Sequence, residues 1–367
     1  MRAWRFHGFG DMRLHELPDP ECGPHDAVVR VRVVQPSVTE AVLAFGGETF
    51  GIEDVRAHLR HPPAALFGHE YCAEVVEVGA AVGDLRPGTR VADVASLPCL
   101  ACALCREGRP DDCRRGPHVG WDLPGCLSDV AVVPARGLVA VPDAVGDREA
   151  ACLQPSADAV AAVEAAGLEP GARVAVIGQG PMGGYALQLA RAAGAAQVVV
   201  VDVRPEPLAI ARRLGADAAL DATEVDVVDA VRELTDGRGV DVVFESAGGP
   251  PAQGLAGSAT LDQALELVRD TGRVVPLALV AGRTPMDLLG WRSRAVQLVF
   301  PPLGATRHLR RAAELAADGR LRLDPYISHG LAGLERMPEA FDITAHKASH
   351  GALGPCQVLI DTDGGIP

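Results

Sequence analysis

The chain has 367 residues, of which 48% are hydrophobic and 22% charged. A chain of this length is longer than a single hydrophobic core usually accommodates, so we expect two domains. The composition excludes disordered, collagen-like and coiled-coil proteins. The formal net charge of -14 repels nucleic-acid phosphates and anionic membrane surfaces, so we expect neither as a partner. The N-terminus lacks the apolar run of a signal peptide. We therefore expect a cytoplasmic protein whose partner is a small-molecule substrate.

The first part of the chain, to about residue 150, is expected to be mostly β-structure. Residues 26–34 and 71–78 are short, β-branched and partly alternating, and Pro/Gly-rich turns separate the segments around them. From about Ala151, apolar runs alternate with Ala-rich helical stretches. Continuous Val/Ile runs separated by helices predict a parallel sheet that is buried on both faces. The sequence therefore predicts an α/β protein that joins a mostly β domain to a doubly wound parallel sheet.

A glycine-rich loop follows the apolar strand expected at residues 173–177. Gly178, Gly180 and Gly183 have the spacing G-x-G-x-x-G, and a helical stretch follows them. The first glycine allows a tight turn, the second lets the backbone approach a pyrophosphate, and the third lets the helix pack on the strand. The strand before the loop and the helix after it make a dinucleotide site the favoured interpretation over a glycine turn without a ligand.

Asp202 ends the next apolar strand, where a carboxylate can bind the ribose hydroxyls of a dinucleotide. It would repel a 2′-phosphate and so favours NAD, although Arg204 lies nearby and can pair with the extra phosphate of NADP. Ser246 ends a later strand, at the edge where open α/β sheets bind ligands. The residues predicted to bind the cofactor are Gly178, Gly180, Pro181, Met182, Gly183, Asp202, Arg204 and Ser246.

Four of the nine cysteines lie in one Pro/Gly/Arg-rich loop, residues 97–114, with the spacing C-x2-C-x2-C-x7-C. Four thiolates in such a loop can close a tetrahedral shell around Zn²⁺ and leave no position for a substrate. Iron–sulfur clusters use the same ligand type, but their spacings differ. The predicted ligands of this structural zinc are Cys99, Cys102, Cys105 and Cys113. Three other cysteines carry no spacing signal and are expected to be buried, namely Cys22, Cys126 and Cys356.

Together these features resemble the zinc-containing alcohol dehydrogenases of the medium-chain dehydrogenase/reductase superfamily, especially its polyol and threonine dehydrogenase-like branch. Further family-like stretches are Gly68-His69-Glu70 and residues 236–248. The resemblance implies a GroES-like catalytic domain, residues 1–151 plus 302–367, interrupted by a Rossmann domain, residues 152–301. It also implies hydride transfer between NAD(P) and an alcohol or carbonyl in a cleft between the domains, and a homodimer or homotetramer.

The positions of a catalytic zinc depart from that family's pattern. Where the family usually presents a cysteine, a histidine and a later acidic or cysteine ligand, this chain has Ser37, His69 and Gln154. A serine hydroxyl ionises at far higher pH than a thiol and an amide brings no charge, so both are poor zinc ligands. Glu70 is a remaining candidate beside His69, although an extended strand would point the two side chains apart. We therefore expect no normal catalytic zinc, with His69 and Glu70 as the residual metal-binding candidates.

Without a metal, hydrogen-bond donors must polarise the substrate carbonyl. Thr39 stands where the resemblance implies a proton-relay hydroxyl, and we expect Thr39, His69 and Ser37 to be the catalytic groups. The hydroxyls can instead satisfy backbone groups, and His69 can be structural. The first hypothesis is an oxidoreductase of a secondary alcohol or ketone, polyol- or cyclitol-like. The second is a reductase of an activated C=C bond, and the third is a nucleotide-binding protein without catalysis.

Overall fold

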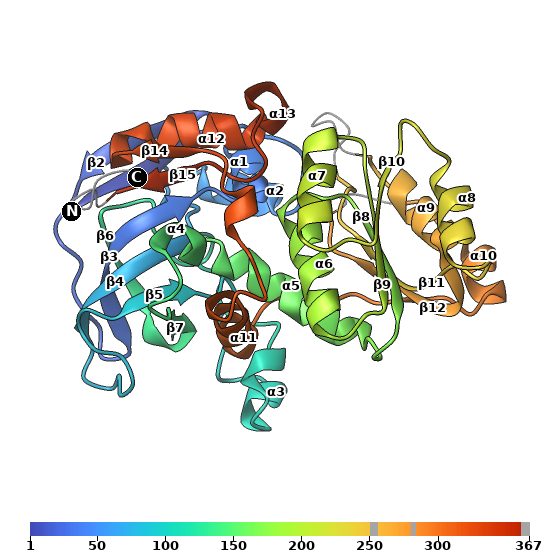
Figure 1. Ribbon diagram of the computed structural model, residues 1–367. Coiled ribbons are helices and arrows are strands. Elements are labelled where there is room, and N and C mark those ends of the chain that lie inside the picture. The colour runs from blue at the N-terminus through green and yellow to red at the C-terminus, as the bar shows by residue number, and fades with distance from the viewer. Residues whose placement is uncertain (250–255, 280–283, 361–367) are drawn as a thin grey trace. The chain divides into compact units, whose positions relative to one another are not determined.

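The computed structural model describes residues 1–249, 256–279 and 284–360, and the chain divides into two compact units (Figure 1). Unit 1 comprises Met1–Ala157, Leu303–Asp318 and Ile327–Pro367, and unit 2 comprises Asp158–Pro302 and Gly319–Tyr326. The predicted domain ranges also contain residues 250–255, 280–283 and 361–367, which lie outside the described residues.

The assignment of the segment Gly319–Tyr326 differs from the predicted domain division, which placed this segment in the first domain. The structure groups it with unit 2. The physical reason is a set of hydrogen bonds that the sequence does not reveal, from Gln188 to the backbone of Arg322 and from Gln179 to the hydroxyl of Tyr326.

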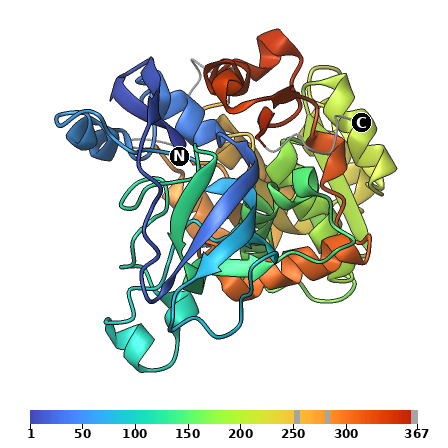
Figure 2. The same ribbon diagram turned by 90° about the vertical axis from the view of Figure 1, so that its left-hand side faces the viewer.

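Unit 1 is built on a seven-stranded sheet and on a separate hairpin, β1-β2 (Figure 2). Six strands of the sheet follow the order β14-β15-β3-β4-β5-β7, and β6 pairs with the first half of β3, on the edge away from β4. All pairings are antiparallel except that of β14 with β15. The strands are β1 (Arg2–Gly8), β2 (Asp11–Glu16), β3 (Asp26–Gln35), β4 (Glu70–Val78), β5 (Arg90–Asp93), β6 (Val130–Pro134), β7 (Leu138–Ala140), β14 (Gly330–Ala332) and β15 (Gln357–Leu359). The two predicted β segments are therefore strands β3 and β4.

Most helices of unit 1 are short, and an aromatic cluster joins the β1-β2 hairpin and the turn before β4 to the last long helix of the unit. The ring of Phe67 packs edge-on against Phe6 at 4.9 Å and lies 6.1 Å from Phe341, and all three rings are buried. The helices are α1 (Val38–Ala44), α2 (Ile52–His58), α3 (Ala103–Arg106), α4 (Asp147–Ala150), α11 (Thr306–Ala317), α12 (Met337–Ala345) and α13 (Lys347–His350), with 3₁₀ turns at Pro110–Asp112, Ala135–Gly137 and Leu334–Arg336.

Unit 2 contains a six-stranded, wholly parallel sheet in the order β10-β9-β8-β11-β12-β13. This is the predicted doubly wound sheet, and the order reverses between β8 and β11, the point at which such sheets bind ligands. The central strands are buried Val/Ile runs, as both-face burial requires. The strands are β8 (Arg173–Ile177), β9 (Gln197–Asp202), β10 (Ala218–Asp221), β11 (Val240–Glu245), β12 (Val268–Pro276) and β13 (Gln297–Leu298).

Helices connect the parallel strands of unit 2. They are α6 (Pro181–Ala192), α7 (Pro205–Arg213), α8 (Val227–Leu234), α9 (Ala259–Leu267) and α10 (Leu288–Ser293), and a 3₁₀ turn covers Asp324–Tyr326. Helix α5 (Leu153–Ala166) begins in unit 1 and ends in unit 2. In the described part of the chain, no helix combines the length and the apolar character needed to cross a bilayer.

Candidate active site and metal centre

The glycine-rich loop connects β8 to α6 and leaves space for a ligand. Gly178 has a positive φ of 86°, which favours glycine, and a Cβ on Gly183 would overlap the carbonyl oxygen of Gly178. A Cβ on Gly180 would meet no atom within 4 Å, so the loop is open at that position. Helix α6 begins at Pro181, directly after this position, and the N-terminus of a helix favours an anion. The residues present therefore fit a bound pyrophosphate.

Asp202 closes the loop at the end of β9. Its Oδ2 accepts a hydrogen bond from the backbone N–H of Gln179 at 2.6 Å, and its Oδ1 accepts from the N–H groups of Val203 and Arg204 at 2.8 and 3.0 Å. A carboxylate has acceptor capacity beyond these bonds, so Asp202 can still bind ribose hydroxyls. The three N–H donors hold the Asp202 side chain in place at the end of β9.

Two other predicted cofactor residues have local structural contacts. The hydroxyl of Ser246 donates to the carbonyl oxygens of Ile177 and Gly178, at 2.9 and 2.8 Å, and thereby supports the turn of the loop. Arg204 is half-buried and immediately precedes α7. The structure therefore brings the predicted residues together at one edge of the parallel sheet.

The four predicted zinc ligands converge in unit 1, and their sulfur atoms all lie within 4.8 Å of one another. The Sγ of Cys102 lies 3.6 Å from that of Cys105 and 3.9 Å from that of Cys113, and Cys99 and Cys105 are 4.0 Å apart. Tetrahedral Zn²⁺ with Zn–S bonds of about 2.3 Å requires sulfur atoms about 3.8 Å apart. The cluster therefore has the dimensions of a closed ZnS₄ site.

Backbone donors favour the thiolate at two cysteines of this loop, whereas burial and the neighbouring sulfur atoms raise the pKa of Cys105 to about 12. The N–H groups of Cys99 and Arg115 donate to the Sγ of Cys113, at 3.3 and 3.4 Å, and lower its pKa to about 6. The N–H of Ala101 likewise lowers the pKa of Cys99. The thiolate is the form that binds a metal, and a thiol with a pKa near neutral reaches this form readily. Elsewhere, Cys126 and Cys356 are buried as expected, whereas Cys22 is only half-buried.

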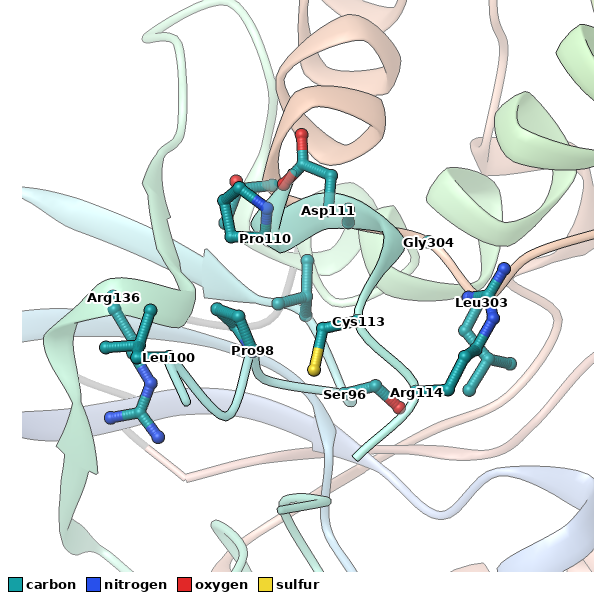
Figure 3. A pocket seen from close by; sticks show the side chains of 13 residues that line it. Ser96, Pro98, Leu100, Pro110, Asp111, Cys113, Arg114, Arg136, Leu303 and Gly304 are labelled. Atoms are coloured by element: carbon teal, nitrogen blue, oxygen red, sulfur yellow. The ribbon is translucent and has the colours of Figure 1, made fainter. Parts of the chain in front are cut away.

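A cavity of about 220 Å³ lies beside the cysteine loop, and the close-up view shows the side chains that line it (Figure 3). Its walls come from residues 94–114, from Arg136 and from residues 303–306 at the start of α11. The lining includes Cys113 but none of Ser37, Thr39 or His69. It is therefore not the site predicted for hydride transfer.

That predicted site is organised by a buried acid, Glu40, in the first turn of α1. Its Oε1 lies 2.7 Å from Nδ1 of His69 and accepts the N–H of Gly68 at 2.7 Å, while Oε2 accepts the N–H of Ser37 at 2.9 Å. Burial favours the neutral acid, but His69 and the two backbone donors outweigh it and lower the pKa of Glu40. Glu40 is therefore an anion that orients the imidazole of His69.

The hydroxyls predicted to be catalytic lie on the same turn. Ser37 caps α1, because its Oγ accepts the N–H of Glu40 at 3.1 Å while the Glu40 side chain returns to Ser37. Thr39 is half-buried in the first turn of the helix. The serine hydroxyl thus has a capping role, and Glu40, which the family resemblance did not select as catalytic, is the residue that contacts His69.

The side chain of Glu70 lies near His69 and does not point away from it, as it would in an extended strand. Its Oε1 lies 4.0 Å from Nε2 of His69, and its Oε2 accepts a hydrogen bond from Gln35 at 2.5 Å. The alternation rule fails because Gly68 has a φ of 90° and β4 begins only at Glu70. His69 therefore precedes the strand, and the chain bends between the two side chains.

Gln154 lies in the first turn of α5, and Cys152 immediately precedes that helix. The Sγ of Cys152 lies 3.6 Å from Oε1 of Gln35. Among the described residues, the four-cysteine loop is the only group of three or more His, Cys, Asp or Glu side chains whose ligand atoms converge. Among these described residues, no two further His, Cys, Asp or Glu ligand atoms form such a group with His69.

Two aromatic residues beside His69 were not found from the sequence. The ring of His118 lies 5.2 Å from that of His69, Trp121 lies 5.6 Å from it, and these two rings are 4.6 Å apart. Burial and the nearby His69 lower the pKa of His118 to about 4, so it is uncharged at neutral pH. Neither residue belongs to a short motif, so only the folded chain could reveal them.

Comparisons with known proteins agree with this architecture. A dinucleotide loop on a doubly wound sheet and a cysteine loop beside a β-rich unit define a nicotinamide-dependent dehydrogenase. The alcohol dehydrogenase GroES-like domain model matches residues 23–143, and the zinc-binding dehydrogenase model matches residues 181–318. L-threonine 3-dehydrogenase from Pyrococcus horikoshii is 31% identical over 340 residues, 92% of either chain.

Solved structures show the same relationship. An alcohol dehydrogenase from Thermus sp. ATN1 has a TM-score of 0.83 and 27% identity, covering 98% of this chain and 100% of its own. A protein of the zinc-binding dehydrogenase type from Sinorhizobium meliloti 1021, bound to NADP, has a TM-score of 0.82 and 29% identity, covering 98% of each chain. The chain belongs to the zinc-type alcohol dehydrogenase family of the medium-chain dehydrogenases, and is an NAD(P)-dependent oxidoreductase.

Proposed function

We propose that this protein interconverts a neutral secondary alcohol and its ketone, using Glu40 and His69 as the acid–base pair instead of a catalytic zinc. The observation that carries this proposal is the 2.7 Å contact between Glu40 Oε1 and His69 Nδ1, in a site whose remaining donors do not form a metal shell. A buried carboxylate that holds one nitrogen of an imidazole orients the other nitrogen and stabilises the imidazolium form.

In alcohol oxidation, Nε2 of His69 accepts the proton of the substrate hydroxyl as the carbonyl forms. Glu40 holds Nδ1 and balances the positive charge that develops on the ring. Glu70 Oε1 lies 4.0 Å from Nε2 and can accept a hydrogen bond from a neighbouring hydroxyl of a polyol substrate. In ketone reduction, His69 returns the proton to the same oxygen. When bound, the dinucleotide supplies the hydride acceptor or donor.

Thr39 is proposed as an additional hydrogen-bond donor, since it lies next to Glu40 on the first turn of α1. Ser37 contributes indirectly, because its hydroxyl caps the helix and its N–H binds Glu40. Neither hydroxyl polarises a substrate carbonyl as strongly as a divalent metal ion does. The proposed site therefore suits substrates whose carbonyl accepts hydride with little polarisation.

The surroundings of His69 favour a neutral substrate of the polyol or cyclitol type. Glu40 and Glu70 make the site negative, His118 is uncharged, and Trp121 offers an aromatic face on which the C–H groups of a ring can pack. Several sequence relatives are L-threonine 3-dehydrogenases. We propose that the negative site discriminates against the carboxylate of an amino acid.

NAD is the proposed cofactor, and NADP the alternative. Three backbone N–H groups position the Asp202 side chain at the end of β9, where an acidic residue repels a 2′-phosphate. Arg204 lies beside it and can reduce that repulsion. The kcat/KM for NAD⁺ should exceed that for NADP⁺ by about tenfold or more. Equal values, or a preference for NADP⁺, would overturn the assignment.

A panel of secondary alcohols, polyols, cyclitols and their ketones, assayed through NADH absorbance, tests the proposed reaction. We expect turnover that depends on His69 and Glu40, with His69→Ala and Glu40→Gln each reducing kcat/KM by about 10²-fold or more. Thr39→Val is the comparison variant and should cost less. Turnover unaffected by either of the first two substitutions would contradict the proposal.

The absence of a fitting metal shell also favours a second candidate, reduction of an activated C=C bond. Conjugate hydride addition needs only a hydrogen bond at the remote carbonyl oxygen, which His69 can donate when protonated. Product analysis on an enone distinguishes the two reactions. A saturated ketone supports this alternative, and an allylic alcohol supports the carbonyl chemistry proposed first. Nucleotide binding without any turnover would instead leave a non-catalytic role.

We also propose a structural zinc at the four-cysteine loop, supported by its sulfur spacing. A homodimer or homotetramer is supported in unit 2 by the edge strand β13 and by Leu288, Leu289 and Phe300, which are between 72% and 75% exposed. Light scattering that gives the mass of one chain would contradict this. A cytoplasmic location is proposed because nine free cysteines suit a reducing compartment.

A further inference from the structure

Helix α6 carries a second glycine that the dinucleotide motif does not require. Gly184 follows Gly183 inside the helix, where glycine is less favourable than alanine. A Cβ at this position would overlap the hydroxyl oxygen of Tyr326. Gly184 therefore makes room for the tyrosine, whose ring is 2% exposed.

Tyr326 reaches from this position to the glycine-rich loop. Its hydroxyl accepts a hydrogen bond from Nε2 of Gln179 at 3.2 Å, and the Gln179 side chain is fully buried. The other amide atom of Gln179 has no hydrogen-bond partner among the described residues. If the amide is turned over, the tyrosine hydroxyl donates to the oxygen instead, so Tyr326 is the partner in either orientation.

A second contact fixes the segment that carries Tyr326. Oε1 of Gln188 accepts the N–H of Arg322 at 2.7 Å, and Nε2 of Gln188 donates to the carbonyl oxygen of Arg322 at 3.1 Å. Gly184 and Gln188 are four residues apart and therefore lie on one face of α6. The segment Gly319–Tyr326 is thus held along this face of the helix, up to the loop that precedes it.

We propose that Tyr326 is a positioning residue for dinucleotide binding. It holds the Gln179 side chain, while the Gln179 N–H binds Asp202, and so keeps residues 178–183 in the conformation that receives the pyrophosphate. A loop that is ordered before binding loses less entropy when the ligand binds. This inference rests on the proposal that the loop binds the dinucleotide.

Tyr326 lies at the boundary between the two units of the chain. Tyr326 is the last residue of the segment that belongs to unit 2, and the next residue, Ile327, belongs to unit 1. The dinucleotide loop is therefore hydrogen-bonded to the point at which the chain passes from the nucleotide-binding unit to the unit that contains His69.

The test compares NADH affinities of the full-length, zinc-loaded protein by fluorescence titration. Tyr326→Phe keeps the ring but leaves the buried Gln179 amide without its partner, and should raise the Kd about three- to tenfold. The KM for NAD⁺ should rise by a similar factor, with kcat within about twofold of the wild type. Gln179→Leu should raise the Kd similarly and provides the same test if the first variant folds poorly.

The double variant Y326F/Q179L isolates the interaction. Because each substitution removes the same hydrogen bond, its Kd should be no higher than that of the weaker-binding single variant. Tyr71→Phe is the matched control, because it also removes a buried tyrosine hydroxyl from its hydrogen bond, here to Asp93 in unit 1. Its Kd should stay within about twofold of the wild-type value, the margin allowed for a substitution off the loop.

Three results would overturn the inference. A lower melting temperature for Y326F with an unchanged Kd would reduce Tyr326 to a structural role. Multiplied effects in the double variant would mean that the two side chains act independently. A wild-type protein that binds no NADH would remove both this inference and the dinucleotide assignment, whereas the first two results leave that assignment intact.

Discussion

Replacement of Glu40 by Gln should destabilise unit 1 and impair His69 at the same time. The buried carboxylate faces only donors, namely the N–H groups of Ser37 and Gly68 and Nδ1 of His69. Whichever way the new amide is turned, its NH₂ group meets at least one of them. An unsatisfied buried donor costs about 1–3 kcal/mol and the lost charge weakens the other bonds, so we expect a loss of about 3 kcal/mol.

Calorimetry and steady-state kinetics measure the two effects. For a domain of this size, about 3 kcal/mol corresponds to a fall of about 6–12 °C in Tm. The kcat should fall about 10²- to 10⁴-fold, because the imidazole loses the anion that orients it. Since the folded pKa of Glu40 lies below its unfolded value of 4.5, its stabilisation is present above that pH and lost below it. The stability gap between E40Q and the wild type should therefore close in acid.

Glu40→Asp serves as the control, because it keeps the charge on a shorter side chain. It should recover part of the stability and part of the activity. An E40Q variant that matched the wild type in Tm and in kcat, or an E40D variant no better than E40Q in either measurement, would contradict the role of the Glu40 charge.

Three further predictions concern other groups of unit 1. Burial raises the pKa of Asp93, which accepts the Tyr71 hydroxyl at 3.0 Å, to about 7, so its contribution to stability is present below its unfolded pKa of 3.8 and lost as pH rises through 7. Melting curves should show Asp93→Asn gaining on the wild type from pH 5 to pH 8, and parallel curves would contradict this. For His118, with a folded pKa of about 4 and an unfolded value of 6.5, stability should fall as pH drops from 6.5 to 4, and His118→Gln should lack this fall. Cys102→Ser should lose the structural zinc and lower the Tm, and elemental analysis that finds zinc retained would count against the ligand set.

The sequence alone predicted the features that depend on residues close together in the chain. Gly178, Gly180 and Gly183 lie within six residues, and the spacing of Cys99, Cys102, Cys105 and Cys113 itself determines that the sulfur atoms can converge. The Val runs of unit 2 predicted the parallel sheet, because burial on both faces leaves no polar alternation. Such features depend on neighbours along the chain.

The sequence was insufficient where partners are distant. Glu40 and His69 meet because α1 and the turn before β4 are brought together by the fold, and Tyr326 approaches Gln179 from far along the chain. The sequence left the direction of Glu70 open, because the alternation rule holds only in an extended segment and the positive φ of Gly68 turns the backbone before the strand begins. The aromatic pair His118 and Trp121 has no spacing signal at all.

The zinc content of the purified chain distinguishes a metal-free acid–base pair from a second metal site at His69. The protein is purified without added metal, and zinc per chain is measured by elemental mass spectrometry alongside kcat. We expect about one zinc, bound by the four cysteines and lost in Cys102→Ser, and none that depends on His69. About two zinc ions per chain, with the second lost together with activity in His69→Ala, would contradict hydride transfer by a metal-free acid–base pair.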